Sequence, residues 1–203
     1  MHFANNIGAD TEYEMVRDYF EPVMRETKDK NVVVDMSCAT GLFTRRLARS
    51  GDYDRVIGCD YSESMLIEAR RRINEDDMFE NLSRTKLDLV RVDVAQIPMQ
   101  DESVNALHAG AAMHCWPDVD AGLSEIYRVL KPGGRYFAST FLSSYFSTLQ
   151  TTERDDFPQQ MQAFNYFESN EVLKDMIIKA GFSEDKVTVD LLGNACIIIK
   201  AEK

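Results

Sequence analysis

Apolar and polar residues along the chain alternate in blocks that predict strands and helices in turn. Short β-branched runs at 31–34 and 55–59 are typical of strands that are buried on both faces of a sheet. Between these runs, Phe43 and Leu47 fall on one face of a helix that should end at Ser50–Gly51. The order strand, turn, helix, strand predicts a βαβ unit, and hence an α/β fold, at the start of the chain.

The same alternation continues to the end of the chain. A third strand is expected at 89–95, and a helical face follows it before a turn at 131–134. A length of 203 residues suits one α/β domain, so we expect residues 1–203 to form a single domain. The last part holds a strand, a helix and two strands with a connection of hairpin length, at 135–141, 171–180, 186–191 and 195–200.

The turn after the first strand carries candidate ligand-binding residues. Small side chains at Ser37, Ala39 and Gly41 let backbone N–H groups approach a ligand. Asp60, which ends the second strand, can accept hydrogen bonds from ribose hydroxyls. The turn lacks the G-x-G-x-x-G spacing of dinucleotide sites, and Asp35 would repel a pyrophosphate. The pattern therefore favours a nucleoside ligand that carries an ammonium group, and it argues against a nicotinamide-dependent oxidoreductase.

This turn resembles the first motif, (D/E)-x-G-x-G-x-G, of the class I S-adenosylmethionine-dependent methyltransferases. Asp35 and Gly41 match the motif, whereas Ser37 and Ala39 replace two of its glycines. Because both replacements carry a Cβ atom, we expect the backbone at these two positions to avoid positive φ.

Later segments resemble further motifs of the same family, in the same order. Residues 60–66 resemble its D-x-S-x-x-M-L segment, in which the acid holds the ribose and the next residues flank the adenine. Asp93 corresponds to the acid that takes the adenine amine. The resemblance implies that S-adenosylmethionine binds here and leaves as S-adenosylhomocysteine. The cofactor-binding residues that it implies are Asp35, Ser37, Ala39, Thr40, Gly41, Asp60, Tyr61, Met65, Asp93, Val94, Ala109 and Gly110.

The resemblance also implies the fold, which composition alone does not reveal. We expect a Rossmann-like, seven-stranded and mostly parallel sheet with helices on both faces. Its strand order should be 3-2-1-4-5-7-6, with strand seven antiparallel to its neighbours. The carboxyl ends of the central strands would then border the cofactor.

The segment 107–117 is similar to an H-A-G-A-x-x-H-C-W-P run in a branch of plant and algal plastid-type methyltransferases related to the ubiquinone and menaquinone biosynthesis group. A hydroxyl or acidic carbon acceptor would benefit from a general base, usually a histidine. His114 is our first candidate and His108 the second, because His108 can be buried within the fourth strand. Alternatively, both histidines are structural. Trp116 is expected to offer an apolar surface to the acceptor.

Two segments are expected to shape the acceptor pocket. Residues 1–28 carry an apolar helical stripe, which forms either a partial lid over the cofactor or a helix packed on the sheet edge. Residues 142–169 hold six aromatic side chains, and connections of this length are usually functional. We interpret this segment as a substrate-side insertion whose aromatic residues line an apolar pocket or cap the core.

Charge and cysteine content narrow the classes of partner. A net charge of -11 disfavours nucleic acid as a partner unless the basic residues cluster. The four cysteines lack metal-binding spacing, so we expect no metal site and a reducing, cytoplasmic location. No apolar run is long enough to span a bilayer. The first residues show no transit pattern, so a plastid location would require an upstream segment.

The resemblance and the residues together favour one function. We expect S-adenosylmethionine-dependent methyl transfer to a small-molecule acceptor with aromatic or apolar character. An S-adenosylmethionine-binding protein with non-methylating chemistry, or a catalytically silent partner subunit, are the alternatives. The identity of the acceptor, the methylated atom and the oligomeric state stay open at this point.

Overall fold

A seven-stranded sheet forms the centre of the protein, as the computed structural model shows for residues 8–26, 30–76, 85–143, 167–193 and 196–203. Its order is β3-β2-β1-β4-β5-β7-β6. Neighbouring strands are parallel except for β7, which runs antiparallel to β5 and β6. The expected sheet order is confirmed. The strands are β1 (Val32–Met36), β2 (Arg55–Asp60), β3 (Lys86–Arg91), β4 (Val104–Ala109), β5 (Leu130–Phe141), β6 (Val187–Leu192) and β7 (Cys196–Glu202).

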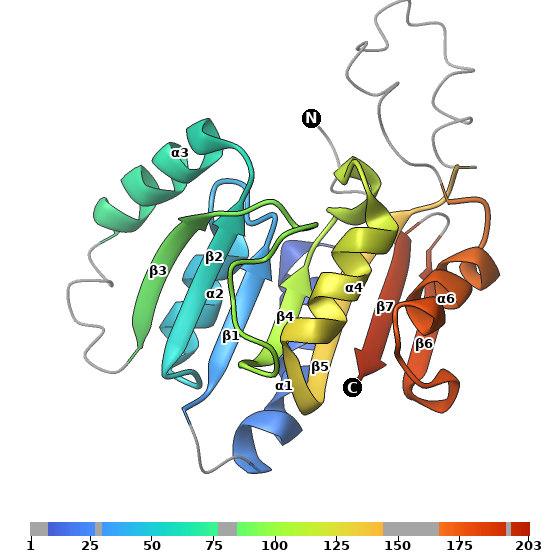
Figure 1. The fold of residues 1–203 in the computed structure, drawn as a ribbon. Coiled ribbons are helices and arrows are strands. Elements are labelled where there is room, and N and C mark those ends of the chain that lie inside the picture. Colours follow the sequence, from blue (N-terminus) through green and yellow to red (C-terminus); the bar gives the residue numbers. More distant parts are fainter. Residues whose placement is uncertain (1–7, 27–29, 77–84, 144–166, 194–195) are drawn as a thin grey trace, which may run out of the picture.

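Helices cover both faces of the sheet and give a three-layer architecture (Figure 1). Apolar residues of α4 and α6 pack on one face, and those of α1 and α2 pack on the other. The helices are α1 (Ala9–Glu26), α2 (Leu42–Ser50), α3 (Glu63–Asn74), α4 (Val119–Val129) and α6 (Asn170–Lys179), with short 3-10 helices η2 (Met113–Cys115) and η4 (Glu184–Lys186).

The apolar run in β1 follows from its position between these two layers. Successive side chains of a strand point to opposite faces, so a central strand needs apolar residues at every position. Val34 lies in the cluster beneath α4, whereas Val33 lies in the cluster beneath α1 and α2. Both side chains are fully buried. The adjacent carboxyl end of β1 is thereby held rigidly, and that edge carries the candidate site.

The third strand lies earlier in the chain than the sequence predicts, at Lys86–Arg91 instead of 89–95. It ends at Arg91, and Asp93 lies in a turn in which the Ala95 N–H donates to Asp93 Oδ1 over 2.9 Å. The Gln96 N–H also donates to the Asp93 carbonyl over 2.9 Å. An aspartate that accepts from the N–H two residues on favours a turn over an extended strand. The turn brings Asp93 to the same edge of the sheet as the ends of β1 and β2.

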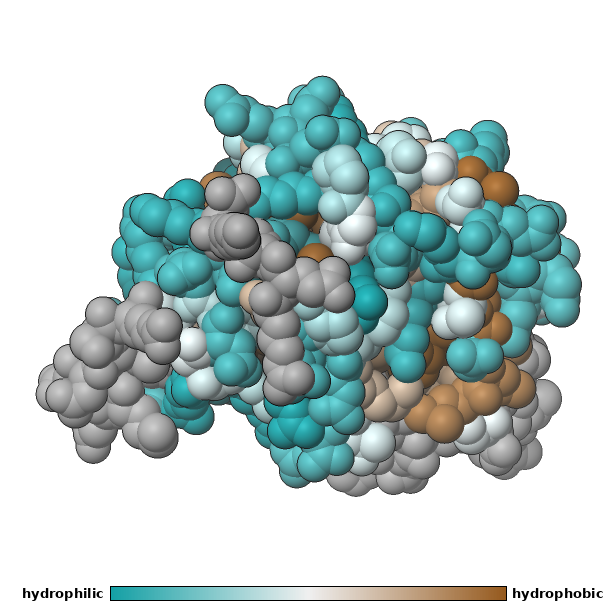
Figure 2. Space-filling model, turned by 90° about the horizontal axis from the view of Figure 1, so that it is seen from below, coloured by the Kyte–Doolittle hydropathy of each residue, from teal (hydrophilic) through white to brown (hydrophobic). Residues whose placement is uncertain are grey.

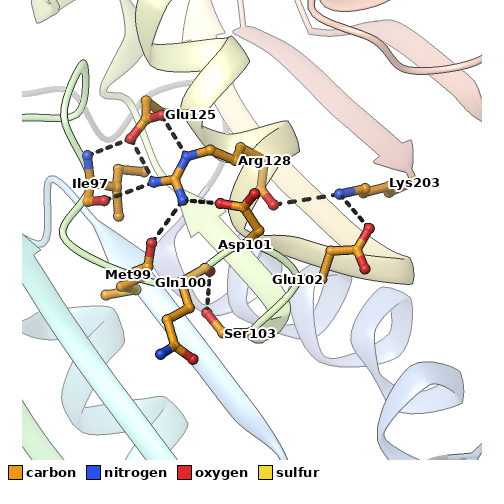
Figure 3. A network of polar contacts seen from close by, with 9 residues as sticks. All are labelled: Ile97, Met99, Gln100, Asp101, Glu102, Ser103, Glu125, Arg128 and Lys203. Atoms are coloured by element: carbon orange, nitrogen blue, oxygen red, sulfur yellow. Dashed lines mark hydrogen bonds and ion pairs between the residues drawn. The ribbon is translucent and has the colours of Figure 1, made fainter.

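The connection between β3 and β4 is fixed to α4 by Arg128 (Figure 3). The Arg128 guanidinium donates to the carbonyls of Ile97 and Met99, over 2.8 Å in each case. It also pairs with Asp101 at 2.7 Å and donates twice to Glu125. Glu125 accepts in turn from the Ile97 N–H at 2.7 Å. Arg128 and Glu125 therefore supply hydrogen-bond partners to the main chain of Ile97 and Met99, in a connection that has no helix of its own.

The edge opposite the candidate site, seen in Figure 2 from below, is mostly hydrophilic, with hydrophobic residues gathered to one side. This distribution agrees with the acidic composition of the chain. Among the helices that the structure describes, none combines the length and apolar character needed to cross a bilayer.

Replacing Arg128 tests the contribution of this network to stability. Arg128→Met should lower the free energy of unfolding by about 1–3 kcal/mol, because it removes the guanidinium that donates to two carbonyls and to Glu125. Arg71→Met is the matched control, since Arg71 pairs with Glu68 and Glu75 on the exposed surface of α3. We expect the control to cost less than about 1 kcal/mol. Urea unfolding measures both variants, and equal losses would contradict this account.

Candidate cofactor and methyl-transfer site

The turn after β1 is left-handed at three positions, although glycine occupies only one of them. Ser37 has φ 58°, Ala39 has φ 48° and Gly41 has φ 75°. The expectation that Ser37 and Ala39 avoid positive φ was wrong. Each such residue costs on the order of 1 kcal/mol, and hydrogen bonds to the rest of the protein offset that cost. The Cys38 N–H donates to the Cys59 carbonyl over 2.8 Å, and the Ala39 N–H donates to Asp60 Oδ2 over 2.8 Å.

Glycine suits position 41 because of both its backbone conformation and its close neighbour. A Cβ atom on Gly41 would lie 3.2 Å from the Cβ of Ala69 in α3, and its φ is positive as well. Gly41 therefore lets α2 begin directly against α3. The result is a narrow turn of small residues at the carboxyl end of β1, as the sequence predicts.

Asp60 is held between the two loops that follow β1 and β2. Its Oδ2 accepts from the Ala39 N–H and its Oδ1 accepts from the Ser62 N–H, each over 2.8 Å. These two bonds fix the orientation of the carboxylate. Each oxygen keeps a further lone pair, so the group can still accept hydrogen bonds from a ligand diol.

Apolar side chains lie exposed next to this carboxylate. Tyr61 is 66% exposed and Met65 is 42% exposed, which is high for side chains of this size. Arg91 lies over the Tyr61 ring at 5.3 Å and donates to its carbonyl. Asp93 is exposed in the turn that follows β3, while its neighbour Val94 is buried. Exposed apolar surface beside an acid suits a flat, nitrogen-bearing ring.

Asp35 points inward, because its carboxylate belongs to a buried polar cluster. The side chain is 2% exposed. Its Oδ2 accepts from the Thr44 hydroxyl over 2.5 Å, and its Oδ1 accepts from His108 Nδ1 over 2.8 Å. Asp35 thus joins β1 to α2 and to β4. A contact between Asp35 and a ligand ammonium group stays a prediction.

His108 lies inside β4 and is 1% exposed, so it is a core residue, as the sequence analysis allowed. Its ring stacks on Phe43 at 4.4 Å between centroids. Its Nε2 lies 3.7 Å from Glu12 Oε1, which is an ion-pair distance and too long for a hydrogen bond. Burial lowers the pKa of His108, but the carboxylates of Asp35 and Glu12 more than offset this and raise it to about 9. The imidazole is therefore charged at neutral pH.

Glu12 is the site residue that the sequence analysis missed. It lies in α1 on the same stripe as Val16 and Phe20, at a spacing of four residues. The sequence does place Glu12 on the apolar stripe of this helix. An acid at a buried position needs a charged or hydrogen-bonding partner, so this placement could have indicated a site residue. Ion pairing with His108, together with a hydrogen bond from Ser139, outweighs burial and holds the pKa of Glu12 below its usual range.

His114 lies in the short helix η2 after β4 and is 3% exposed. Its Nδ1 is 3.4 Å from the Thr140 hydroxyl, and its ring meets Phe141 edge-on at 5.5 Å. Burial lowers the pKa of His114 to about 4. The imidazole is therefore neutral at physiological pH and able to accept a proton, although as a weak base.

Trp116 does not form an exposed apolar surface. It is 4% exposed and belongs to the core beneath α4, so that expectation was wrong. Its indole N–H donates to the Ser37 hydroxyl over 3.0 Å. Trp116 thus connects the segment after β4 to the turn after β1. The indole N–H makes this connection, while the rest of the ring packs in the core.

The segment that begins at the end of β4 passes directly over the buried cluster. Ala109 is fully buried, whereas Gly110 is half-buried. A Cβ atom on Gly110 would lie 2.9 Å from His108 Cε1, so only glycine fits without a shift. The predicted cofactor-binding residues therefore lie at the carboxyl ends of β1, β2 and β4 and in the segments that follow β1, β2, β3 and β4. Of the aromatic residues predicted at 142–169, only Phe167 is described, and it is buried in the core; the others fall in 144–166, outside the described residues.

The sheet order reverses between β1 and β4, and open α/β sheets bind ligands at such a switch point. Together with the narrow turn and Asp60, this arrangement has the fold that the resemblance to S-adenosylmethionine-dependent methyltransferases implies. Residues 34–138 match the family model described as a methyltransferase domain, and the chain belongs to that family.

Known proteins similar to this chain agree with that assignment. An uncharacterized chloroplastic methyltransferase of Arabidopsis thaliana is 36% identical over 97% of this chain and 52% of its own length. A demethylmenaquinone methyltransferase of Staphylococcus saprophyticus is 29% identical over 86% of this chain and 81% of its own length. A crystal structure of an S-adenosylmethionine-dependent methyltransferase from Methanosarcina mazei has a TM-score of 0.69 and 18% identity, over 90% of this chain and 96% of that one.

The expected family is therefore confirmed. The chain spans about half the length of the Arabidopsis relative that it matches, and 36% of a second chloroplastic one.

Raising the pH should destabilise the protein through His108. Its folded pKa of about 9 lies above the unfolded value of 6.5, so the folded state holds the proton more tightly. The stability that this contributes, on the order of 1–3 kcal/mol, is complete below pH 6.5 and is lost as the pH rises through 9. Urea unfolding between pH 6.5 and 9.5 should show a steeper decline for wild type than for His108→Gln. Parallel declines would mean that His108 is neutral in the folded protein.

Proposed function

We propose that this protein transfers the methyl group of S-adenosylmethionine to a small-molecule acceptor. The observation that carries the proposal is the left-handed turn after β1, whose Ala39 N–H is hydrogen-bonded to Asp60. This bond aligns a narrow turn and a ribose-binding acid at the switch point of the sheet. A merely connecting turn would have no need of two strained non-glycine residues.

Each residue group at this edge has a proposed role. Asp60 accepts the two ribose hydroxyls, and Tyr61 and Met65 enclose the adenine ring. Asp93 accepts from the adenine amine, and the following Val94 N–H donates to the ring. The remaining groups lie along the methionine part of the cofactor, with Ser37, Ala39, Thr40 and Gly41 on one side and Asp35, Ala109 and Gly110 on the other.

The reaction is an in-line displacement at the methyl carbon. The bond from the methyl carbon to sulfur breaks as a bond to the acceptor nucleophile forms, and the sulfonium becomes a neutral thioether. Such a step depends chiefly on alignment of the reacting atoms. A proton that leaves the acceptor can be taken by His114, which is neutral at physiological pH.

A groove beside the site supports an apolar acceptor. It has a volume of about 560 Å³ and lies between the start of α4 and the start of α6. Phe167, Val172 and Met176 supply apolar walls, and Asp118, Asp120 and Glu168 add negative charge. These walls suit an aromatic or prenylated molecule, while the acids disfavour a nucleic acid or a strongly anionic metabolite. Pro117, which ends the segment 107–117, and Phe167 and Glu168, which belong to 142–169, contribute to its lining.

The chloroplastic relatives support a plastid location over the cytoplasmic one expected from the sequence. The demethylmenaquinone methyltransferase, by its name, supports a quinone-like acceptor as the first to be tried. A cofactor-binding protein without methyl transfer is the alternative. It would bind S-adenosylmethionine with the same residues and leave every trial acceptor unmethylated.

Removing Asp60 tests the cofactor site. Asp60→Ala should weaken S-adenosylmethionine binding by on the order of 2–4 kcal/mol, because charge-assisted hydrogen bonds to the ribose are lost. Calorimetry measures the dissociation constant. Asp54→Ala is the matched control, since Asp54 also accepts a backbone N–H but lies at the opposite end of β2. A dissociation constant for Asp60→Ala within about twofold of the control would remove Asp60 from the ribose site.

Replacing His114 tests the proposed base. His114→Ala should lower turnover by roughly 10²–10⁴-fold while cofactor affinity stays unchanged. Turnover is measured with an acceptor that the wild type methylates, beginning with reduced demethylmenaquinone. Added imidazole should restore part of the activity. If the variant retains wild-type turnover, alignment alone drives the reaction and His114 is a packing residue.

A further inference from the structure

Glu12 places a carboxylate from α1 against the carboxyl ends of β4 and β5. Its side chain is 14% exposed, and Oε1 accepts from the Ser139 hydroxyl over 2.7 Å. The same oxygen lies 3.7 Å from His108 Nε2, which has no hydrogen-bond partner in the described part of the chain. Burying a second carboxylate beside Asp35 is unfavourable for stability alone. This arrangement therefore calls for a functional explanation.

Through Ser139, Glu12 supports the loop after β4. The Ser139 hydroxyl donates to Glu12 and accepts from the Ala111 N–H over 2.8 Å. Ala111 has φ 48°, a conformation that L-residues seldom adopt. A Cβ atom on Gly110 would lie 3.2 Å from Glu12 Oε1. The carboxylate is therefore directly beneath the backbone of Gly110 and Ala111.

This position corresponds to the methionine end of the cofactor, a step that rests on the proposed function. With the ribose at Asp60 of β2 and the adenine at Asp93 beyond β3, the rest of the molecule extends toward β1 and β4. Asp35 of β1 and His108 of β4 are paired in register there. Glu12 joins this pair from the helix side.

The cluster carries a net negative charge at neutral pH. Asp35 and Glu12 are carboxylates, and His108 between them is an imidazolium, which leaves one negative charge. In the described part of the chain, the other groups that face the cluster do not cancel this charge. Arg46 of α2 is paired with Asp10 at 2.6 Å. Burial raises the pKa of the three thiols that face the carboxylates, so these thiols stay neutral: Cys38, Cys59 and Cys196.

We propose that Glu12 is a specificity-determining residue that makes the site prefer the cationic sulfonium of S-adenosylmethionine to the neutral thioether of S-adenosylhomocysteine. The two ligands share the nucleoside, the amino group and the carboxylate, and differ by one methyl group and one positive charge. A fixed negative charge under the methionine end attracts the positively charged sulfonium of S-adenosylmethionine. It does not attract the neutral thioether of S-adenosylhomocysteine. Methyl transfer then weakens binding of the spent cofactor and favours its release.

Calorimetry with both ligands tests this inference on Glu12→Gln, which keeps the shape and removes the charge. The preference for S-adenosylmethionine should fall by at least about threefold relative to wild type. Glu14→Gln is the matched control, since Glu14 is exposed on the same helix. It should leave the preference unchanged, as should Glu12→Asp, which keeps the charge. Equal weakening of both ligands by Glu12→Gln would overturn the inference and leave Glu12 as a structural residue.

A second measurement needs only the wild-type protein. Between pH 7 and 9.5, His108 releases its proton and the cluster becomes more negative, so the preference for S-adenosylmethionine should rise. The amino group common to both ligands cancels in the ratio of the two dissociation constants. A ratio that stays constant would overturn the inference. Failure of the proposed function would look different, because the wild type would then bind neither ligand, and both proposals would fall.

Discussion

The hydrogen bond between Asp35 and His108 joins the two strands at which the sheet order reverses. At such a switch point the loops that follow the two neighbouring strands run in opposite directions, which leaves a crevice at the carboxyl ends of the strands. In this protein, a charged pair closes the base of that gap, with Thr44 of α2 and Glu12 of α1 attached to it. The first two helices of the chain, α1 and α2, are thereby fixed to one point under the candidate site.

Such a pair is not an efficient way to stabilise a core, since desolvation of buried charges consumes much of the attraction between them. Phe43 stacks on the imidazole, and the two carboxylates more than balance its positive charge. An apolar pair at positions 35 and 108 would fill the same space. We therefore attribute the buried charge to the proposed cofactor, whose positively charged methionine end would lie next to the cluster.

Residue patterns were sufficient for the strands, helix and narrow turn of the βαβ unit, whereas the sheet order came from the family resemblance. Those features depend on local patterns: buried strands in β1 and β2, and Asp60 at the end of β2. The partners of His108 could not be predicted in the same way, because Asp35 is 73 positions away in sequence. Glu12 lies still further from Ser139, at a separation of 127 residues. Only the packing of α1 across the sheet brings such side chains together.

For the turn after β1, the motif correctly predicted a narrow turn, but the backbone conformation expected at Ser37 and Ala39 was wrong. The intrinsic conformational preference of non-glycine residues disfavours positive φ at Ser37 and Ala39. The energy of that preference is smaller than the stabilisation from the hydrogen bonds that hold the turn. The Ser37 hydroxyl accepts from Trp116, and the Ala39 N–H donates to Asp60, so both replacements are held by residues of other loops. Glycine at these positions would permit the turn, whereas here tertiary contacts impose it. The same contacts connect the proposed ribose site to the loop after β4, so the acceptor side and the cofactor side of the site share one rigid base.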